Sequence, residues 1–101
     1  MSDGTDVVID EKIKVTNREP RMYKVIFLND DTTPMDFVVQ VLKEIFKHTD
    51  KTATALTMEI HTENSGVVGV YNHEIAEQKA VETTTLARDH GFQLQVRLEE
   101  E

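Results

Sequence analysis

A largely apolar run at Met22–Leu28, broken by Lys24, is the first clear pattern in the chain. Tyr23, Val25 and Phe27 share one side of a pleated strand, and Ile26 and Leu28 lie on the other. We therefore expect a strand that other elements cover. The residues that follow, Asn29–Thr32, bond readily to their own backbone and favour turns, so a polar loop is predicted after the strand.

A helical pattern follows this loop. Thr33 is the expected N-cap, Pro34 suits a first helical position because it lacks an N–H, and Asp36 places an acid in the first turn. Apolar residues then recur at helical spacing and form one wide stripe: Phe37, Val38, Val41, Leu42, Ile45 and Phe46. We expect this helix to anchor the core.

A second helix is predicted from Asp50, as its cap, to a turn near Asn64. Spacings of three and four residues place Thr57, Ile60 and His61 on one face of it.

The last third of the chain predicts a strand, a helix and a strand. Val67–Tyr71 is a short apolar strand, and Asn72 is the expected cap of a helix that runs to Gly91. Small residues recur on the inner face of that helix, at Ala76, Ala80, Thr83 and Ala87. Strict alternation over Phe92–Leu98 predicts a half-buried strand.

Together these elements predict an α+β fold, a small three-stranded antiparallel sheet packed against three helices in the order β-α-α-β-α-β. A length of 101 residues leaves room for one core only. Residues 1–20 show no sustained periodicity and are expected to form a flexible N-terminal extension, with residues 21–101 as a single domain.

Composition removes several classes of function. Eleven basic against nineteen acidic residues give a net charge of −8, which disfavours nucleic acid and anionic membrane surfaces and favours cationic ligands. The chain has no cysteine, so thiolate chemistry is excluded. No signal peptide or membrane span is recognisable, and we expect a cytoplasmic protein.

The densest polar cluster, Asn29, Asp30 and Asp31, follows the first strand, and His61 is positioned to face it. Acid–base hydrolysis lacks a placed nucleophile, and no standard metal-binding spacing occurs. An α-amino group fits better, because carboxylate, amide and neutral imidazole groups can all accept from an ammonium. From the residues alone, however, a turn, a helix cap and an interfacial histidine explain the same pattern, and function stays open.

Residues Tyr23–Val38, which include the segment Asn-Asp-Asp-Thr-Thr-Pro-Met, resemble the signature of the ClpS adaptors of the bacterial N-end rule pathway. The resemblance continues through His61, Gly69–Tyr71, Glu74–Glu77 and Lys79 to Leu94 and Leu98, and covers about residues 21–99. It implies a non-enzymatic, monomeric adaptor of the bacterial cytoplasm that needs no cofactor or metal. The implied cargo is a protein or peptide that exposes Leu, Phe, Tyr or Trp at its N-terminus.

By matching position, the resemblance assigns three sets of residues. Asn29, Asp30 and His61 hold the α-amino group, and Asp31 helps to set the local field. An apolar pocket for the first side chain is lined by Phe27, Leu28, Thr33, Met35, Val38, Thr57, Ile60 and Leu94. Glu74 and Lys79 contact the N-terminal domain of a ClpA- or ClpC-type AAA+ unfoldase, and residues 1–20 assist hand-over.

Two residues depart from the family pattern. Thr57 stands where many members carry a larger apolar residue, typically Met, which implies a roomier or more polar wall. Asn64 stands where Gly is usual, and Asn is the next best residue for a positive φ. Two other classes remain as alternatives: an unrelated interaction module of the same fold, such as a ribosomal stalk-like domain, and a metal-dependent hydrolase.

Overall fold

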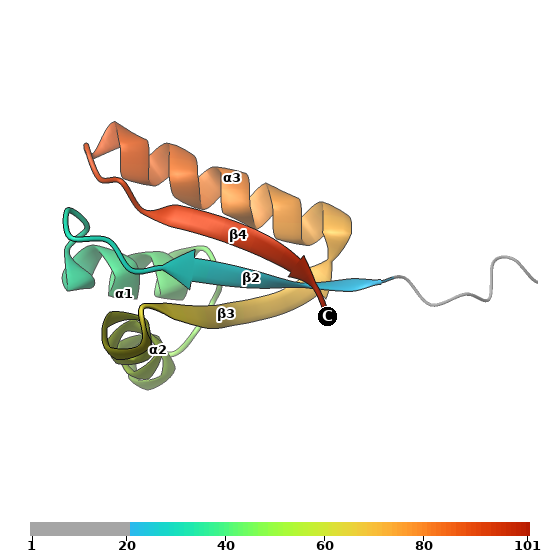
Figure 1. The fold of residues 1–101 in the computed structure, drawn as a ribbon, viewed down its shortest axis with the longest axis horizontal. Helices are drawn as coiled ribbons and strands as arrows, with labels where there is room; N and C mark the ends of the chain where they lie inside the picture. Colours follow the sequence, from blue (N-terminus) through green and yellow to red (C-terminus); the bar gives the residue numbers. More distant parts are fainter. Residues whose placement is uncertain (1–20) are drawn as a thin grey trace, which may run out of the picture.

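The structure is a computed structural model that describes residues 21–101, so the predicted extension at residues 1–20 lies outside the described residues. The elements are β2 (Met22–Leu28), α1 (Met35–Glu44), α2 (Asp50–Glu63), β3 (Ser65–Asn72), α3 (His73–Asp89) and β4 (Gln95–Glu100). The three helices pack against a three-stranded sheet, and Figure 1 shows α3 running alongside β4. The predicted α+β class and the β-α-α-β-α-β order are confirmed.

Strand β2 is the centre of the sheet, whose order is β3-β2-β4 with both pairings antiparallel. The β2–β3 register shifts between Val25 and Ile26, a bulge. Gly69 lies beside this bulge under the ring of Tyr71, where an added Cβ would come within 2.6 Å of ring atoms. The close approach of the ring explains a glycine inside a strand.

A single hydrophobic cluster joins the three helices to one face of the sheet. Val25 and Phe27 are fully buried on this face, as the apolar run predicted. The helices contribute Val38, Val41, Leu42, Ala53, Ile60, Ala76 and Ala87 to the same cluster. Because β2 is held by strands on both edges and by this cluster, the loop that leaves its end starts from a rigid base.

Helix α1 begins one residue later than expected. Thr33 is not the N-cap: its hydroxyl donates to Asp30 Oδ2 at 2.8 Å, so it faces the loop and not the helix. Pro34 takes the cap position with extended backbone angles and no side-chain cap bond. The acidic residue in the first turn, Asp36, is as predicted.

The same helix also ends before the apolar stripe does. Its last residue is Glu44, and Ile45 is the C-cap. Lys47 then adopts a positive φ of 62°, which lets the His48 N–H donate to the Leu42 carbonyl at 3.0 Å. Phe46 nevertheless stays in the core at 5% exposure, because the chain folds back after the helix and does not continue outward.

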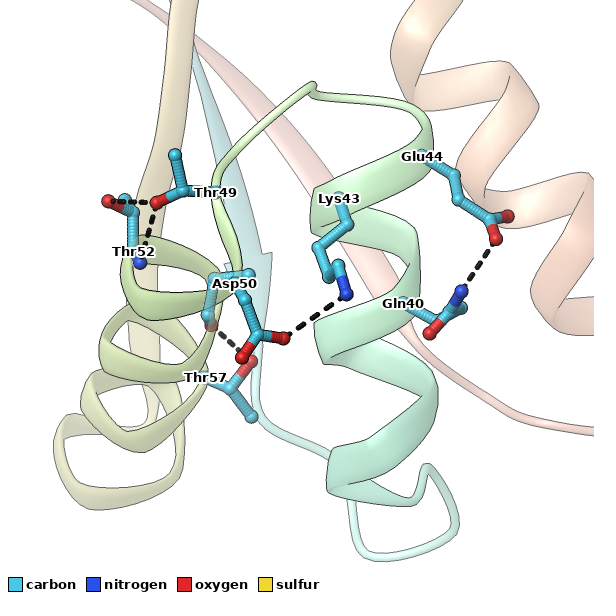
Figure 2. A network of polar contacts seen from close by, with 8 residues as sticks. Gln40, Lys43, Glu44, Thr49, Asp50, Thr52 and Thr57 are labelled. Atoms are coloured by element: carbon cyan, nitrogen blue, oxygen red, sulfur yellow. Dashed lines mark hydrogen bonds and ion pairs between the residues drawn. The ribbon is translucent and has the colours of Figure 1, made fainter.

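Helix α2 is capped by Thr49, and the prediction of Asp50 as the cap is wrong. Thr49 Oγ1 accepts from the Thr52 N–H at 3.1 Å, while the Asp50 carboxylate pairs with Lys43 of α1, also at 3.1 Å (Figure 2). A residue held by an ion pair to the neighbouring helix is not free to turn back onto its own N-terminus.

The third helix agrees with its prediction at both ends. Asn72 Oδ1 accepts from the Ile75 N–H at 3.0 Å, and Gly91 follows the helix with a φ of +79°. Thr83 and Ala87 on its inner face are completely buried.

The two outer strands differ from the sequence-based bounds. Strand β3 is longer than Val67–Tyr71, because it pairs along the whole of β2, from Ser65 opposite Leu28 to Asn72 opposite Met22. Strand β4 begins only at Gln95. The Arg88 guanidinium donates to the carbonyls of Phe92 and Leu94, so the segment before Gln95 is held by α3 and forms a connection.

Candidate functional site

A small cavity lies where β2 ends, enclosed by the loop that follows β2, the first residues of α1, one face of α2 and the approach to β4. Its lining consists of Leu28, Asn29, Asp30, Thr33, Met35, Val38, Thr57, Ile60, His61 and Leu94. Ten residues of four separate segments therefore meet around one space. Residues 29–33 are called the amine loop below, after the group that the resemblance assigns to them.

Backbone pairing brings the amine loop beside α2. The Asn29 N–H donates to the Asn64 carbonyl at 2.9 Å, and Asn64 closes α2 in the left-handed region with a φ of 72°. His61 lies three residues earlier, about one turn back along the helix. The predicted convergence of the loop with the face that carries Thr57, Ile60 and His61 is thus a consequence of how α2 ends.

The Asp30 carboxylate is fixed within the loop by one of its two oxygens. Oδ2 accepts from the Thr32 N–H at 3.1 Å, from the Thr32 hydroxyl in a short contact, and from the Thr33 hydroxyl at 2.8 Å. The hydrogen bond from the Thr32 side chain is the largest cause that lowers the pKa of Asp30 below its ordinary 3.8, and desolvation opposes it. Within residues 21–101 these bonds all go to Oδ2, which leaves Oδ1 as an acceptor for a ligand.

The remaining wall of the cavity is apolar. Val38 is 6% exposed, Ile60 3% and Leu94 1%, whereas Met35 at the rim is 38% exposed. The cavity measures about 20 Å³, room for roughly one water molecule. An acceptor-rich side and an apolar side therefore adjoin in one small space.

Two residues assigned by the resemblance are not part of this lining. Phe27 is fully buried on the core face of β2, where its ring packs edge-on against Phe46 at 5.4 Å between centroids. Phe27 is absent from the cavity lining, and its assignment to the pocket wall stays a prediction. Asp31 is exposed in the amine loop, next to Asp30 but outside the lining.

Thr57 divides the cavity from a second, open groove between α1 and α2. It lines both spaces, together with Met35. Its hydroxyl donates to the Ala53 carbonyl of its own helix at 2.8 Å, a contact drawn in Figure 2. Because the hydroxyl is satisfied within the helix, Thr57 presents its methyl group and a small volume to the cavity.

Glu74 and Lys79, assigned to the unfoldase contact, both lie on α3 and are called the unfoldase surface below. Glu74 is exposed in the first turn of the helix. The Lys79 ammonium points inward: Nζ donates to the Ile45 carbonyl at 2.7 Å and lies 5.3 Å from the ring centroid of Tyr71. Lys79 thereby ties α3 to the carbonyl end of α1.

Sequence reasoning missed two residues that shape the site, Thr32 and Gln93. The Thr32 hydroxyl holds the Asp30 carboxylate and also accepts from the Gln93 N–H at 3.1 Å. The polar turn signal at Asn29–Thr32 was present in the sequence, but the contact across 61 positions carried no signal there.

Across residues 21–101, no three His, Cys, Asp or Glu side chains are grouped so that they could hold a metal ion. In the same range, no helix has the length and apolar character needed to cross a membrane.

Comparison with known proteins identifies relatives over nearly the whole chain. The family model described as "ATP-dependent Clp protease adaptor protein ClpS" matches residues 18–97. A curated protein of Helicobacter hepaticus with the corresponding name is 48% identical over 82 residues, which are 81% of this chain and 83% of that protein. One from Burkholderia cenocepacia is 44% identical over 98 residues, 97% of this chain and 94% of that protein.

A solved structure is similar in both sequence and fold. Agrobacterium tumefaciens ClpS2 bound to L-phenylalaninamide superposes with a TM-score of 0.79 at 43% identity, covering 82% of this chain and 100% of that one. Its ligand carries a free α-amino group and a benzyl side chain.

Proposed function

The chain belongs to the ClpS family of ATP-dependent Clp protease adaptors, and from this premise we propose that it binds proteins by a free N-terminal Leu, Phe, Tyr or Trp and delivers them to a ClpA- or ClpC-type unfoldase. The observation that carries the proposal is the cavity in which acceptors from Asn29, Asp30 and His61 adjoin an apolar wall. A ligand that satisfies both halves has a positive main-chain end and a large apolar side chain.

The amine half recognises charge and geometry together. An α-ammonium has three donors, and an amide oxygen, a carboxylate oxygen and a neutral imidazole nitrogen are three acceptors. Asp30 is held through Oδ2, so Oδ1 meets the ligand without a further loss of side-chain freedom. L-phenylalaninamide in the A. tumefaciens ClpS2 structure is a ligand of the kind that this arrangement favours.

The apolar half must open to admit a side chain. A space of about 20 Å³ is far smaller than Leu or Phe, so binding requires lining side chains to move. Met35 is suited to this movement, because it is unbranched, stands at the rim and is 38% exposed. The groove on the far side of Met35 and Thr57 gives the displaced side chain room.

The apolar and ammonium contacts together lead to modest affinity for the cargo. Burying a Leu or Phe side chain contributes roughly 1.5–3 kcal/mol, and the ammonium contacts offset much of the association cost. We expect a dissociation constant on the order of micromolar, which suits a carrier that must release its cargo.

The deciding experiment compares two peptides that differ only at the amine. A peptide that begins with unblocked Phe is titrated against its N-acetylated form by calorimetry, and acetylation is expected to remove most of the affinity because it removes the charge. Equal affinity of the two peptides contradicts the proposed function.

Delivery is tested separately on the unfoldase surface. Glu74→Arg is expected to weaken binding to an isolated ClpA- or ClpC-type N-terminal domain and to leave Phe-peptide affinity unchanged. Asp36→Arg, another exposed acid in the first turn of a helix, is the control for the change of charge. Equal loss in both variants contradicts a specific role for Glu74.

A further inference from the structure

The Thr32 hydroxyl joins two parts of the candidate site that are 61 positions apart in sequence. It donates to Asp30 Oδ2 in the amine loop and accepts from the Gln93 N–H in the approach to β4. A hydroxyl has one donor and two acceptor positions, so one Thr32 side chain makes both bonds at once. Thr32 itself is exposed and does not line the cavity.

Each end of this bridge holds a residue that does line the cavity. On one side is the Asp30 carboxylate, whose Oδ2 also accepts from the Thr33 hydroxyl. On the other side, Gln93 immediately precedes Leu94, which is 1% exposed and forms part of the apolar wall. The Leu94 carbonyl is held by Arg88 at 3.1 Å, so the Thr32 bond fixes the remaining side of that short connection.

We propose that Thr32 is a positioning residue for cargo binding, which orients the Asp30 carboxylate and couples the amine loop to the Leu94 wall. This inference rests on the proposed function, and it assigns a role to a residue that the cargo does not touch. Linked hydrogen bonds through one hydroxyl strengthen each other, so the loop and the wall are held in one arrangement.

The titration of Asp30 provides an independent readout. The Thr32 side chain is the largest cause of the lowered pKa of Asp30. The other titratable groups of this region are Asp31 in the same loop, Asp36 in the first turn of α1 and His61 on α2, and all three are retained when Thr32 is replaced. Loss of the hydroxyl is therefore expected to move the pKa of Asp30 up toward 3.8.

The experiment uses two variants. Thr32→Val removes the hydroxyl and keeps the shape of the side chain, and Thr32→Ser keeps the hydroxyl. Thr84→Val on α3 is the matched control, because within residues 21–101 its hydroxyl bonds only to carbonyls of its own helix. Side-chain carboxyl titration by NMR is expected to show Asp30 with a raised pKa in Thr32→Val alone. Amide exchange at Gln93 is expected to accelerate in the same variant.

Phe-peptide affinity completes the test. Because water can replace bonds at an exposed site, we expect a loss of about fivefold in Thr32→Val, and less than about twofold in Thr32→Ser and in Thr84→Val. Thr32→Ala serves as a second hydroxyl-free variant if the valine form does not fold.

Failure of this inference is distinguishable from failure of the proposed function. If wild-type chain binds free and acetylated peptides equally, the proposed function fails. If wild type discriminates between them but the hydroxyl-free variants keep the wild-type titration of Asp30, or keep wild-type affinity, the positioning role of Thr32 is overturned.

Discussion

The amine loop and the unfoldase surface use polar side chains in opposite ways. In the amine loop, neighbours hold Asp30 through Oδ2, and its second oxygen makes no hydrogen bond within residues 21–101. On the unfoldase surface, Lys79 directs its ammonium inward to the Ile45 carbonyl and to the rings of Phe46 and Tyr71. Asp30 is bonded through one carboxylate oxygen only within residues 21–101, whereas the Lys79 ammonium is bonded to the fold.

This difference separates two assignments that the resemblance makes in the same way. For Asp30, position and contacts both agree with a binding role. For Lys79, the contacts favour a role in shaping the surface, with Glu74 as the exposed charge that a partner meets. A matched sequence position therefore does not distinguish a contact residue from a supporting one, whereas the direction of the side chain does.

The largest expected effect is on cargo binding when Asp30 is removed. Asp30→Ala is expected to reduce Phe-peptide affinity at least about tenfold, because a charged acceptor is lost. Asp31→Ala is the matched control in the same loop. Its effect is expected to stay within about twofold and to shrink with added salt, since Asp31 acts only through the field. Fluorescence anisotropy at two salt concentrations measures both, and equal losses contradict the assignment.

Next in size is the stability effect of Lys79. Lys79→Met keeps the apolar stem and removes the bond to Ile45, and it is expected to lower the free energy of unfolding by about 1.5 kcal/mol. Lys43→Met, which removes an exposed ion pair with Asp50, is expected to cost less than about 0.5 kcal/mol. Urea denaturation gives both values. Equal costs show that the ammonium of Lys79 is not committed to the fold.

A smaller effect is expected on cargo preference at Thr57. Thr57→Met enlarges the residue that separates the cavity from the open groove, and it is expected to reduce Phe binding relative to Leu by about threefold. Thr57→Val removes only the hydroxyl and is expected to leave the ratio unchanged. Competition between Phe and Leu peptides measures the ratio, and an unchanged ratio in Thr57→Met contradicts a role for residue 57 in selectivity.

A separate effect on stability concerns the turn that joins α2 to the amine loop. Asn64 has a φ of 72°, so Asn64→Gly is expected to change the free energy of unfolding by less than about 0.5 kcal/mol. Asn64→Ala is expected to lower it by about 1 kcal/mol, because alanine has no local bond to offset the strain. Urea denaturation measures the free energy of unfolding. Identical free energies for the two variants show that residue 64 does not keep the left-handed conformation in solution.

Acid is expected to weaken the amine loop in a defined direction. The pKa of Asp30 is lowered on folding. The carboxylate therefore stabilises the folded chain fully at pH values above the pKa that Asp30 has in the unfolded chain. That contribution to stability is lost as the pH falls through the lowered pKa of Asp30 in the folded chain. The loss is reduced in Thr32→Val, where folding shifts the pKa less.

Local pattern determined much of the fold. The apolar run gave β2 its bounds, and Asn72 and Gly91 marked the limits of α3, because these signals depend on residues within one turn of each other. The same reasoning failed where distant groups compete for a side chain. Thr33 does not cap α1 because its hydroxyl bonds to Asp30, and Asp50 does not cap α2 because its carboxylate pairs with Lys43.

The sequence by itself determined the element order, the apolar faces and the presence of acceptors at Asn29, Asp30 and His61, since periodicity and residue type carry that information. The tertiary structure alone decided that Lys79 points inward and that Thr32 meets Gln93. These outcomes depend on which groups lie together once the chain has closed. Each polar side chain then bonds to the partner that packing places within reach, and no local pattern encodes that choice.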